Sequence, residues 1–164
     1  MIRLVQATSA TDFNRVRQLY YETWQATYRG MIADDYLNRL TPQTWHPEKR
    51  IGHMWLAYVG NNLVGVCSYG PARNSAFTGW QEVYSLYVRP HNQGLGVGRQ
   101  LLQAALNALD SGDVYLIVLT ANVHAQRFYQ RFGFGLSTEQ INTQVVGTTL
   151  HESRMVKRLG NSQN

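Results

Sequence analysis

The fold is decided by residues 82–99, which read EVYSLYVRPHNQGLGVGR. Glu82 to Val88 is rich in Val, Tyr and Leu, a composition typical of a β-strand. Three glycines follow at alternate positions, Gly94, Gly96 and Gly98. The residues after them carry apolar side chains at helical spacing. The stretch therefore predicts a strand, a glycine-rich turn and the start of a helix.

This turn has the composition of an anion-binding site. Glycine reaches positive φ and lets a ligand approach the main chain, while free N–H groups and the helix dipole attract phosphate. A Walker loop ends in Gly-Lys-Ser/Thr, where this chain has Gly98-Arg99-Gln100. A dinucleotide loop is spaced G-x-G-x-x-G, whereas the spacing here is G-x-G-x-G. We expect a diphosphate on residues 93–99, and the alternative is an ordinary flexible turn.

Hydropathy patterns on both sides of this stretch predict a single mixed α/β domain. Strands are expected at residues 1–7, 55–59, 63–69, 82–88 and 114–119, near 135–136 and at 151–157. Helices are expected after Thr11 or Asp12, at 34–37, from the glycine turn to Gly112, and from Asn122 to Gly133. Residues 41–50 hold two prolines and predict a loop. The domain is expected to span residues 1–159, with six to seven strands and about four helices, before a flexible tail at 160–164.

Composition and charge narrow the class of protein. Lys and Arg number 15 against 10 Asp and Glu, but the basic residues are scattered from Arg3 to Arg158 and form no recognition motif, so no nucleic-acid partner is expected. No window is apolar enough to span a membrane, and the N-terminus has no secretory signal pattern. The single cysteine, Cys67, excludes an internal disulfide and a cysteine-based zinc site. We expect a cytoplasmic domain with no metal and no membrane partner.

The glycine turn resembles a known signature. Gln93 to Gly98 is similar to the Q/R-x-x-G-x-G/A motif of the GNAT N-acetyltransferases. Glu82 to Pro90 resembles the family's strand before that motif, and Asn122 to Phe134 resembles its second cofactor segment. Trp24 to Leu37 is similar to its acceptor-side helices. The resemblance covers nearly the whole chain. It implies the GNAT fold, acetyl-CoA as cofactor and CoA as product.

The resemblance also implies which residues bind the cofactor. Pantetheine is expected along the main chain of the strand, with the Val88 N–H donating to the carbonyl oxygen, and the diphosphate on the glycine turn. Arg99 either adds charge there or is solvated. The implied cofactor-binding residues are Leu86, Tyr87, Val88, Gln93, Gly94, Leu95, Gly96, Val97, Gly98, Arg99, Asn122, Ala125 and Phe128.

Acetyl transfer to an amine needs a proton donor for the leaving thiolate and an acceptor for the amine proton. Tyr129 lies two helical turns after Asn122 and is the predicted acid; the alternative is a packing tyrosine. Glu82 is the predicted base, acting through water; the alternative is a strand-edge carboxylate paired with an arginine. His53, His91, His124 and His151 are lesser candidates. Cys67 is expected to be a buried small hydrophobe.

The acceptor is not predicted by this sequence. Its pocket is expected between Trp24 and Leu40 and in a loop at residues 138–149, with Trp24, Tyr28 and Tyr36 as candidate contacts. Acidic side chains in the same stretches, Asp34, Asp35 and Glu139, would suit a small cationic amine. A polyamine, an amino acid, an aminoglycoside and a peptide N-terminus all stay open, as does a homodimer. The predicted function is direct acetyl transfer to a primary amine of a small molecule or peptide; the alternative is a non-catalytic acyl-CoA-binding module.

Overall fold

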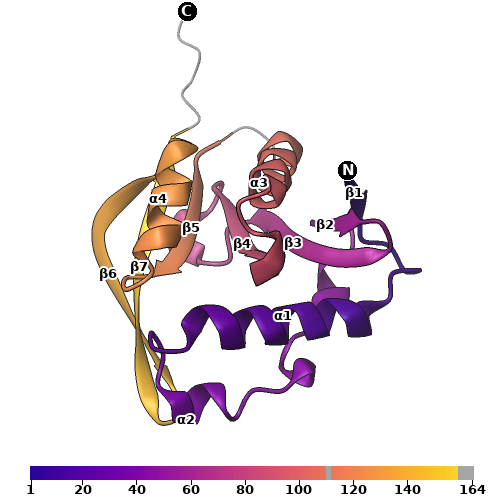
Figure 1. Cartoon of the computed structure of the whole chain (residues 1–164). Coiled ribbons are helices and arrows are strands. Elements are labelled where there is room, and N and C mark those ends of the chain that lie inside the picture. The colour runs from indigo at the N-terminus through magenta and orange to yellow at the C-terminus, as the bar shows by residue number, and fades with distance from the viewer. Residues whose placement is uncertain (110–111, 159–164) are drawn as a thin grey trace, which may run out of the picture.

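The computed structural model describes residues 1–109 and 112–158 as a seven-stranded sheet with helices on both faces (Figure 1). The strands are β1 (Ile2–Gln6), β2 (Met54–Val59), β3 (Asn62–Pro71), β4 (Gln81–Val88), β5 (Val114–Leu119), β6 (Gly135–Val145) and β7 (Thr148–Lys157). The α-helices are α1 (Phe13–Tyr28), α2 (Asp34–Leu37), α3 (Val97–Ala108) and α4 (Val123–Arg131). Short 3-10 helices are η1 (Pro42–Thr44), η2 (Pro47–Arg50), η3 (Ser75–Phe77) and η4 (Pro90–Asn92). The predicted mixed α/β fold is confirmed, while the predicted tail at 160–164 lies outside the described residues.

The sheet opens at its centre. Its order is β1-β2-β3-β4-β5-β7-β6, and every neighbouring pair is antiparallel except β4 and β5. These two parallel strands pair only at Gln81 with Val114 and at Glu82 with Tyr115. Beyond those pairs, β4 and β5 continue without a ladder between them. The remaining part of each strand therefore leaves an unpaired backbone edge that faces the other strand.

A bulge in β4 sets which of its side chains face each side of the sheet. Ser68 pairs with Ser85 and Tyr69 with Val83, so Tyr84 is an extra residue on β4. As a result Val83 and Leu86, three residues apart, pack into the same apolar cluster. Simple alternation would have placed Leu86 on the face of Tyr84.

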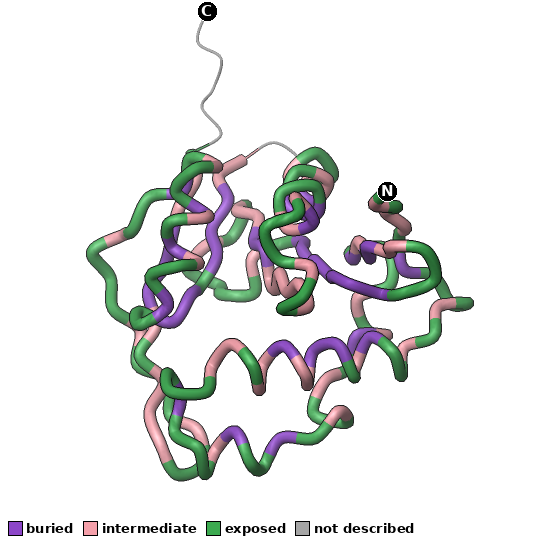
Figure 2. Tube along the Cα trace, in the orientation of Figure 1, coloured by how far each residue is buried: buried purple, intermediate pink, exposed green. Residues whose placement is uncertain are grey.

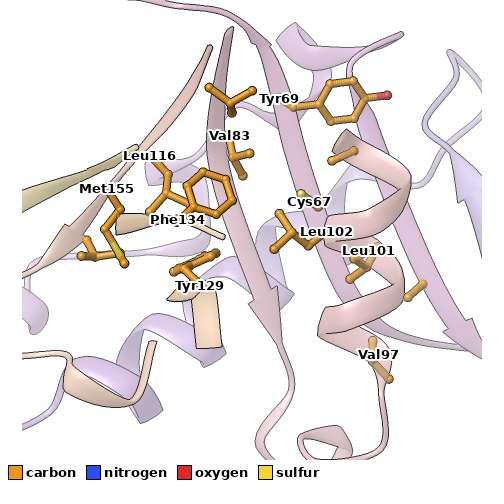
Figure 3. Packing of buried hydrophobic residues seen from close by; sticks show 14 of the residues in the cluster. Cys67, Tyr69, Val83, Val97, Leu101, Leu102, Leu116, Tyr129, Phe134 and Met155 are labelled. Atoms are coloured by element: carbon orange, nitrogen blue, oxygen red, sulfur yellow. The ribbon is translucent and has the colours of Figure 1, made fainter. Parts of the chain in front are cut away.

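Two apolar clusters hold α3 and α1 to opposite faces of the sheet. On one face Leu101 and Leu102 of α3 point towards Cys67 of β3 (Figure 3). On the other face Val16 and Leu19 of α1 are fully buried against β2 and β3. Helix α1 begins where predicted, because the Asp12 side chain accepts from the Asn14 N–H. Burial along the chain in Figure 2 follows these clusters, with β5 largely buried and β6 largely exposed.

Three predicted boundaries are wrong. Helix α3 ends at Ala108, where Leu109 adopts extended backbone, and does not continue to Gly112. Residues 41–50 form η1 and η2 because each proline starts a helical turn. The loop expected at residues 138–149 is a hairpin in which Val145 pairs with Thr148. Strand β6 lies at the sheet edge and is mostly exposed, so its sequence lacks the alternation of apolar and polar residues that predicts a strand.

In the part of the chain that the structure describes, no helix combines the length and hydrophobicity needed to cross a membrane.

Candidate functional site

The divergence of β4 and β5 opens onto a cavity of about 1170 Å³, called the cleft below. Its walls come from β4, the glycine turn, α3, β5 and α4. Most of the predicted cofactor residues line it: Leu86, Tyr87, Val88, Gln93, Gly94, Gly96, Gly98, Arg99, Asn122, Ala125 and Phe128. Leu95 and Val97 do not, because Leu95 points to solvent and Val97 is buried in the core.

The edge of β4 presents hydrogen-bonding backbone to the cleft. The Arg89 N–H donates to the Val64 carbonyl of β3 at 2.8 Å. Successive residues of a strand direct their N–H and C=O groups to opposite sides, so Leu86 and Val88 direct theirs away from β3, into the cleft. The Val88 carbonyl accepts from the Gln93 side chain at 3.0 Å, which ties the glycine turn to the strand. The cleft wall thus offers main-chain groups to a ligand that carries amides of its own.

The glycine turn offers free N–H groups. Gly94 and Gly96 have φ of +79° and +87°, and a Cβ on either would meet no heavy atom within 4 Å. Among the described residues, the N–H groups from Gly94 to Arg99 have no hydrogen-bond acceptor. Arg99 lines the cleft and forms no ion pair with a described carboxylate. An anion fits this turn, because unpaired donors, a helix N-terminus and a cation converge on it.

Helix α4 brings two predicted residues to the other wall of the cleft. The Asn122 side chain accepts from the Ala125 N–H at 3.1 Å and caps the helix. Tyr129 is buried, lines the cleft, and lies beside Phe134 (Figure 3). Burial raises the pKa of the Tyr129 hydroxyl well above that of a free tyrosine, so it keeps its proton far into the alkaline range. No described group hydrogen-bonds to this hydroxyl, which leaves it available to a ligand.

Glu82 lies away from the cleft wall. Its side chain is 2% exposed, and it accepts from the Arg73 N–H, Nε and Nη2 and from the Tyr115 hydroxyl. It is not among the residues that line the cleft. The base role of Glu82 stays a prediction, and these contacts favour the alternative of a carboxylate paired with an arginine.

Of the lesser candidates, only His124 lines the cleft; His53, His91 and His151 do not. The His151 ring instead hydrogen-bonds to Asn142. Cys67 is fully buried in the apolar cluster under α3, and burial raises the pKa of its thiol. The expectation that Cys67 is a small buried residue is confirmed.

A second cavity of about 540 Å³, called the aromatic pocket below, lies between α1, residues 44–50, β3 and β4. It shares Tyr84, Ser85 and Tyr87 with the cleft, so the two cavities meet across β4. Trp24, a predicted acceptor contact, lines this pocket. Tyr28 lines the cleft instead, and its hydroxyl lies 3.0 Å from that of Tyr87.

Tyr36, the third candidate acceptor contact, lies away from both cavities. It packs beside Leu37 and Ile32. None of the acidic residues expected there lines either cavity: Asp34, Asp35 and Glu139. Asp34 pairs with Arg29, and Glu139 with Arg154. Residues 138–149 contribute nothing, because they form the β6–β7 hairpin.

Residues 44–50 form a wall of the aromatic pocket that the sequence did not predict. Pro42 and Pro47 indicated only a loop over residues 41–50. Trp45, Lys49 and Arg50 were the available signal, because they bring aromatic and basic side chains together within six residues. Arg73, in the connection between β3 and β4, also lines the pocket and was not predicted.

Comparisons with known proteins agree with this geometry. Residues 13–134 match the model of the acetyltransferase (GNAT) family. The chain is 26% identical over 102 residues to the uncharacterized N-acetyltransferase YuaI of Bacillus subtilis, covering 60% of this chain and 59% of that protein. It is 31% identical over 91 residues to the spermine/spermidine N(1)-acetyltransferase of the same organism, covering 50% and 59%.

Among solved structures, PaiA N-acetyltransferase from Thermoplasma acidophilum in complex with coenzyme A aligns with a TM-score of 0.74 at 18% identity. The alignment covers 96% of this chain and 99% of that one, and it shows the same fold. Because the family model matches most of the chain, the protein belongs to the GNAT acetyltransferase family. The matching segment spans about three fifths of the length of the curated relatives.

Proposed function

We propose that the protein transfers the acetyl group of acetyl-CoA directly to a primary amine of a small molecule or peptide. The observation that carries this proposal is the divergence of β4 and β5 beside a turn of free N–H groups. The two features give one elongated cleft with amide-binding backbone on one wall and an anion site on another. Coenzyme A has both matching parts, two pantetheine amides and a diphosphate. When bound, acetyl-CoA supplies the acetyl group as a thioester.

The residues that would hold this cofactor fit its chemistry. The Leu86 and Val88 backbone suits the pantetheine amides, and the N–H groups of residues 94–99 suit the diphosphate. Asn122, Ala125 and Phe128 form the opposite wall. The PaiA structure, a complex with coenzyme A, supports the assignment through the shared fold.

The chain's own groups supply the donors of the reaction. Forming the N–C bond needs a neutral amine, so the ammonium proton must leave to solvent before attack, and a second proton leaves the nitrogen as the amide forms. The Val88 N–H is directed into the cleft and can donate to the carbonyl oxygen as its charge grows. The Tyr129 hydroxyl, which is protonated at neutral pH, can donate its proton to the sulfur as the C–S bond breaks, and it then regains a proton from solvent.

The test is release of free thiol from acetyl-CoA in the presence of a panel of primary amines. We expect amine-dependent release and a product heavier by one acetyl group in mass spectrometry. A module that binds acyl-CoA without turnover would show CoA binding by calorimetry and no amine-dependent release. That result would overturn the proposed function and leave the cofactor assignment standing.

A further inference from the structure

The aromatic pocket differs in charge from a site for a polyamine. Its walls carry five aromatic residues, Tyr20, Trp24, Trp45, Tyr84 and Tyr87. Among the described residues, every fully charged side chain that lines it is a cation. A spermine-like acceptor is itself a polycation and needs carboxylates in its site, because like charges in a partly desolvated pocket repel.

The cations of this pocket are Lys49, Arg50 and Arg73. The Arg50 and Arg73 guanidiniums lie 4.2 and 4.6 Å from the centroid of the Tyr84 ring, so both stack near one aromatic side chain. Neither Arg50 nor Lys49 forms an ion pair with any described carboxylate. Their positive charge is therefore not neutralised by the rest of the described chain.

Two carboxylates lie close to the pocket, and both are already paired. Glu82 is held by Arg73, with Nη2 2.6 Å from Oε2. Glu48 lies 2.7 Å from Arg17 and 3.5 Å from the His46 ring. Neither residue lines the pocket.

The pocket also holds hydrogen-bonding groups that are uncharged. The Ser85 hydroxyl lies 2.6 Å from that of Ser68 and 2.7 Å from that of Tyr20, and Ser85 borders the cleft as well. Hydroxyls both donate and accept hydrogen bonds, so these three hydroxyls can bind an amine that approaches the cleft. The Trp24 Nε1–H is buried and has no acceptor among the described residues. A buried donor without a partner costs free energy, and a ligand acceptor relieves that cost.

We propose that the aromatic pocket binds an amine acceptor that also carries a carboxylate, as free amino acids do. This inference rests on the proposed function, since it assigns the acceptor of the same reaction. Arg50, with Lys49 beside it, binds the carboxylate, while the amine lies at Ser85, where the pocket meets the cleft. Arginine suits this task because its planar fork pairs with both oxygens of a carboxylate.

Matched pairs of amines test the carboxylate. The specificity constant kcat/KM is compared for L-phenylalanine and phenethylamine, and for L-methionine and 3-(methylthio)propylamine. Spermine is included as a polycationic acceptor without a carboxylate. We expect the carboxylate-bearing member of a pair to be preferred by about 10- to 100-fold, the range of one charge-assisted contact. Preference for spermine or for the decarboxylated amines would overturn the inference.

Variants locate the carboxylate contact. Arg50→Gln should bring the preference close to unity by lowering the rate with the amino acid much more than with its decarboxylated partner. Arg39→Gln, an exposed arginine outside both cavities, is the matched control and should leave the preference intact. An unchanged preference in Arg50→Gln would remove Arg50 from the site.

A binding measurement separates this inference from the proposed function. Trp24 and Trp45 line the pocket, so amino acids should change tryptophan fluorescence of the CoA-bound protein in a saturable manner that Arg50→Gln weakens. Such binding without thiol release would contradict the proposed acetyl transfer, while it would support an amine with a carboxylate as the ligand of the pocket. If no amino acid tested binds or is acetylated while another amine is acetylated, the inference is overturned and the proposed function stands.

Discussion

The Nη2 of Arg73 lies 2.6 Å from Oε2 of Glu82, in an ion pair whose carboxylate is buried and whose guanidinium is half exposed. Arg73 also borders the aromatic pocket, whereas Glu82 lies behind it. The carboxylate therefore fixes a cation at the pocket wall, and all four of its described hydrogen bonds come from Arg73 and Tyr115.

Glu82→Gln separates a structural carboxylate from a catalytic base. A glutamine amide places an NH₂ against the donors of Arg73 or Tyr115, and we expect a loss of about 1–3 kcal/mol in the free energy of unfolding. The low-pH limb of kcat/KM should stay where it is in the wild type. Asp113→Asn, which breaks the exposed pair with Arg158, is the control and should cost less than about 1 kcal/mol. A flattened low-pH limb in Glu82→Gln would restore the base role.

Gly96→Val tests the glycine turn. Residue 96 has φ of +87°, a conformation that a β-branched residue rarely adopts, and its side chain would project where the phosphates approach. We expect calorimetric CoA binding to be lost in a folded protein. Gly147→Val introduces similar strain in the β6–β7 turn, at φ of +82°, and should leave CoA affinity unchanged. Wild-type affinity in Gly96→Val would contradict the diphosphate assignment.

Tyr129→Phe removes one hydroxyl that no described group hydrogen-bonds. Stability and CoA affinity should therefore change little, while turnover should fall by about 10²–10⁴ if the hydroxyl protonates the thiolate. Tyr36→Phe, outside both cavities, is the matched control. Turnover of Tyr129→Phe equal to that of the wild type would assign Tyr129 to packing beside Phe128 and Phe134.

Alkaline pH should destabilise the protein through its buried and half-buried tyrosines. Burial is the largest cause of a raised pKa at seven of them, Tyr20, Tyr28, Tyr69, Tyr84, Tyr87, Tyr115 and Tyr129. Above a pH of about 10 the unfolded chain loses these protons while the folded chain retains them. The free energy of unfolding should then fall as pH rises. Urea denaturation at pH 8 and at about pH 10.5 measures the change, and equal midpoints would contradict it.

Much of the fold was predictable because local signals coincide with it. Val114 to Leu119 is an apolar strand that the structure reproduces residue for residue, and Asn122 caps α4 as its position before an amphipathic helix indicated. The glycine turn was predictable since Gly94 and Gly96 are needed at positive φ. These features depend on neighbours in sequence.

Features that depend on tertiary contacts were not predictable. The sequence does not show that Arg73 reaches Glu82 across the connection before β4, or that Tyr84 is an extra residue in its strand. Residues 44–50 contain no periodicity, so nothing in the pattern indicated that they face α1 and β4. The two cavities arise where such segments meet.

Residues 44–50 make no strand pairing, yet they supply Trp45, Lys49 and Arg50 to the aromatic pocket and nothing to the cleft. If the aromatic pocket binds the acceptor as proposed, substitutions in this short segment would change the acceptor range without disturbing the sheet or the cleft. Grafting the segment into a relative that acetylates a different amine would then transfer the preference for acceptors that carry a carboxylate. Under that assignment, acceptor choice can vary independently of the chemistry of transfer.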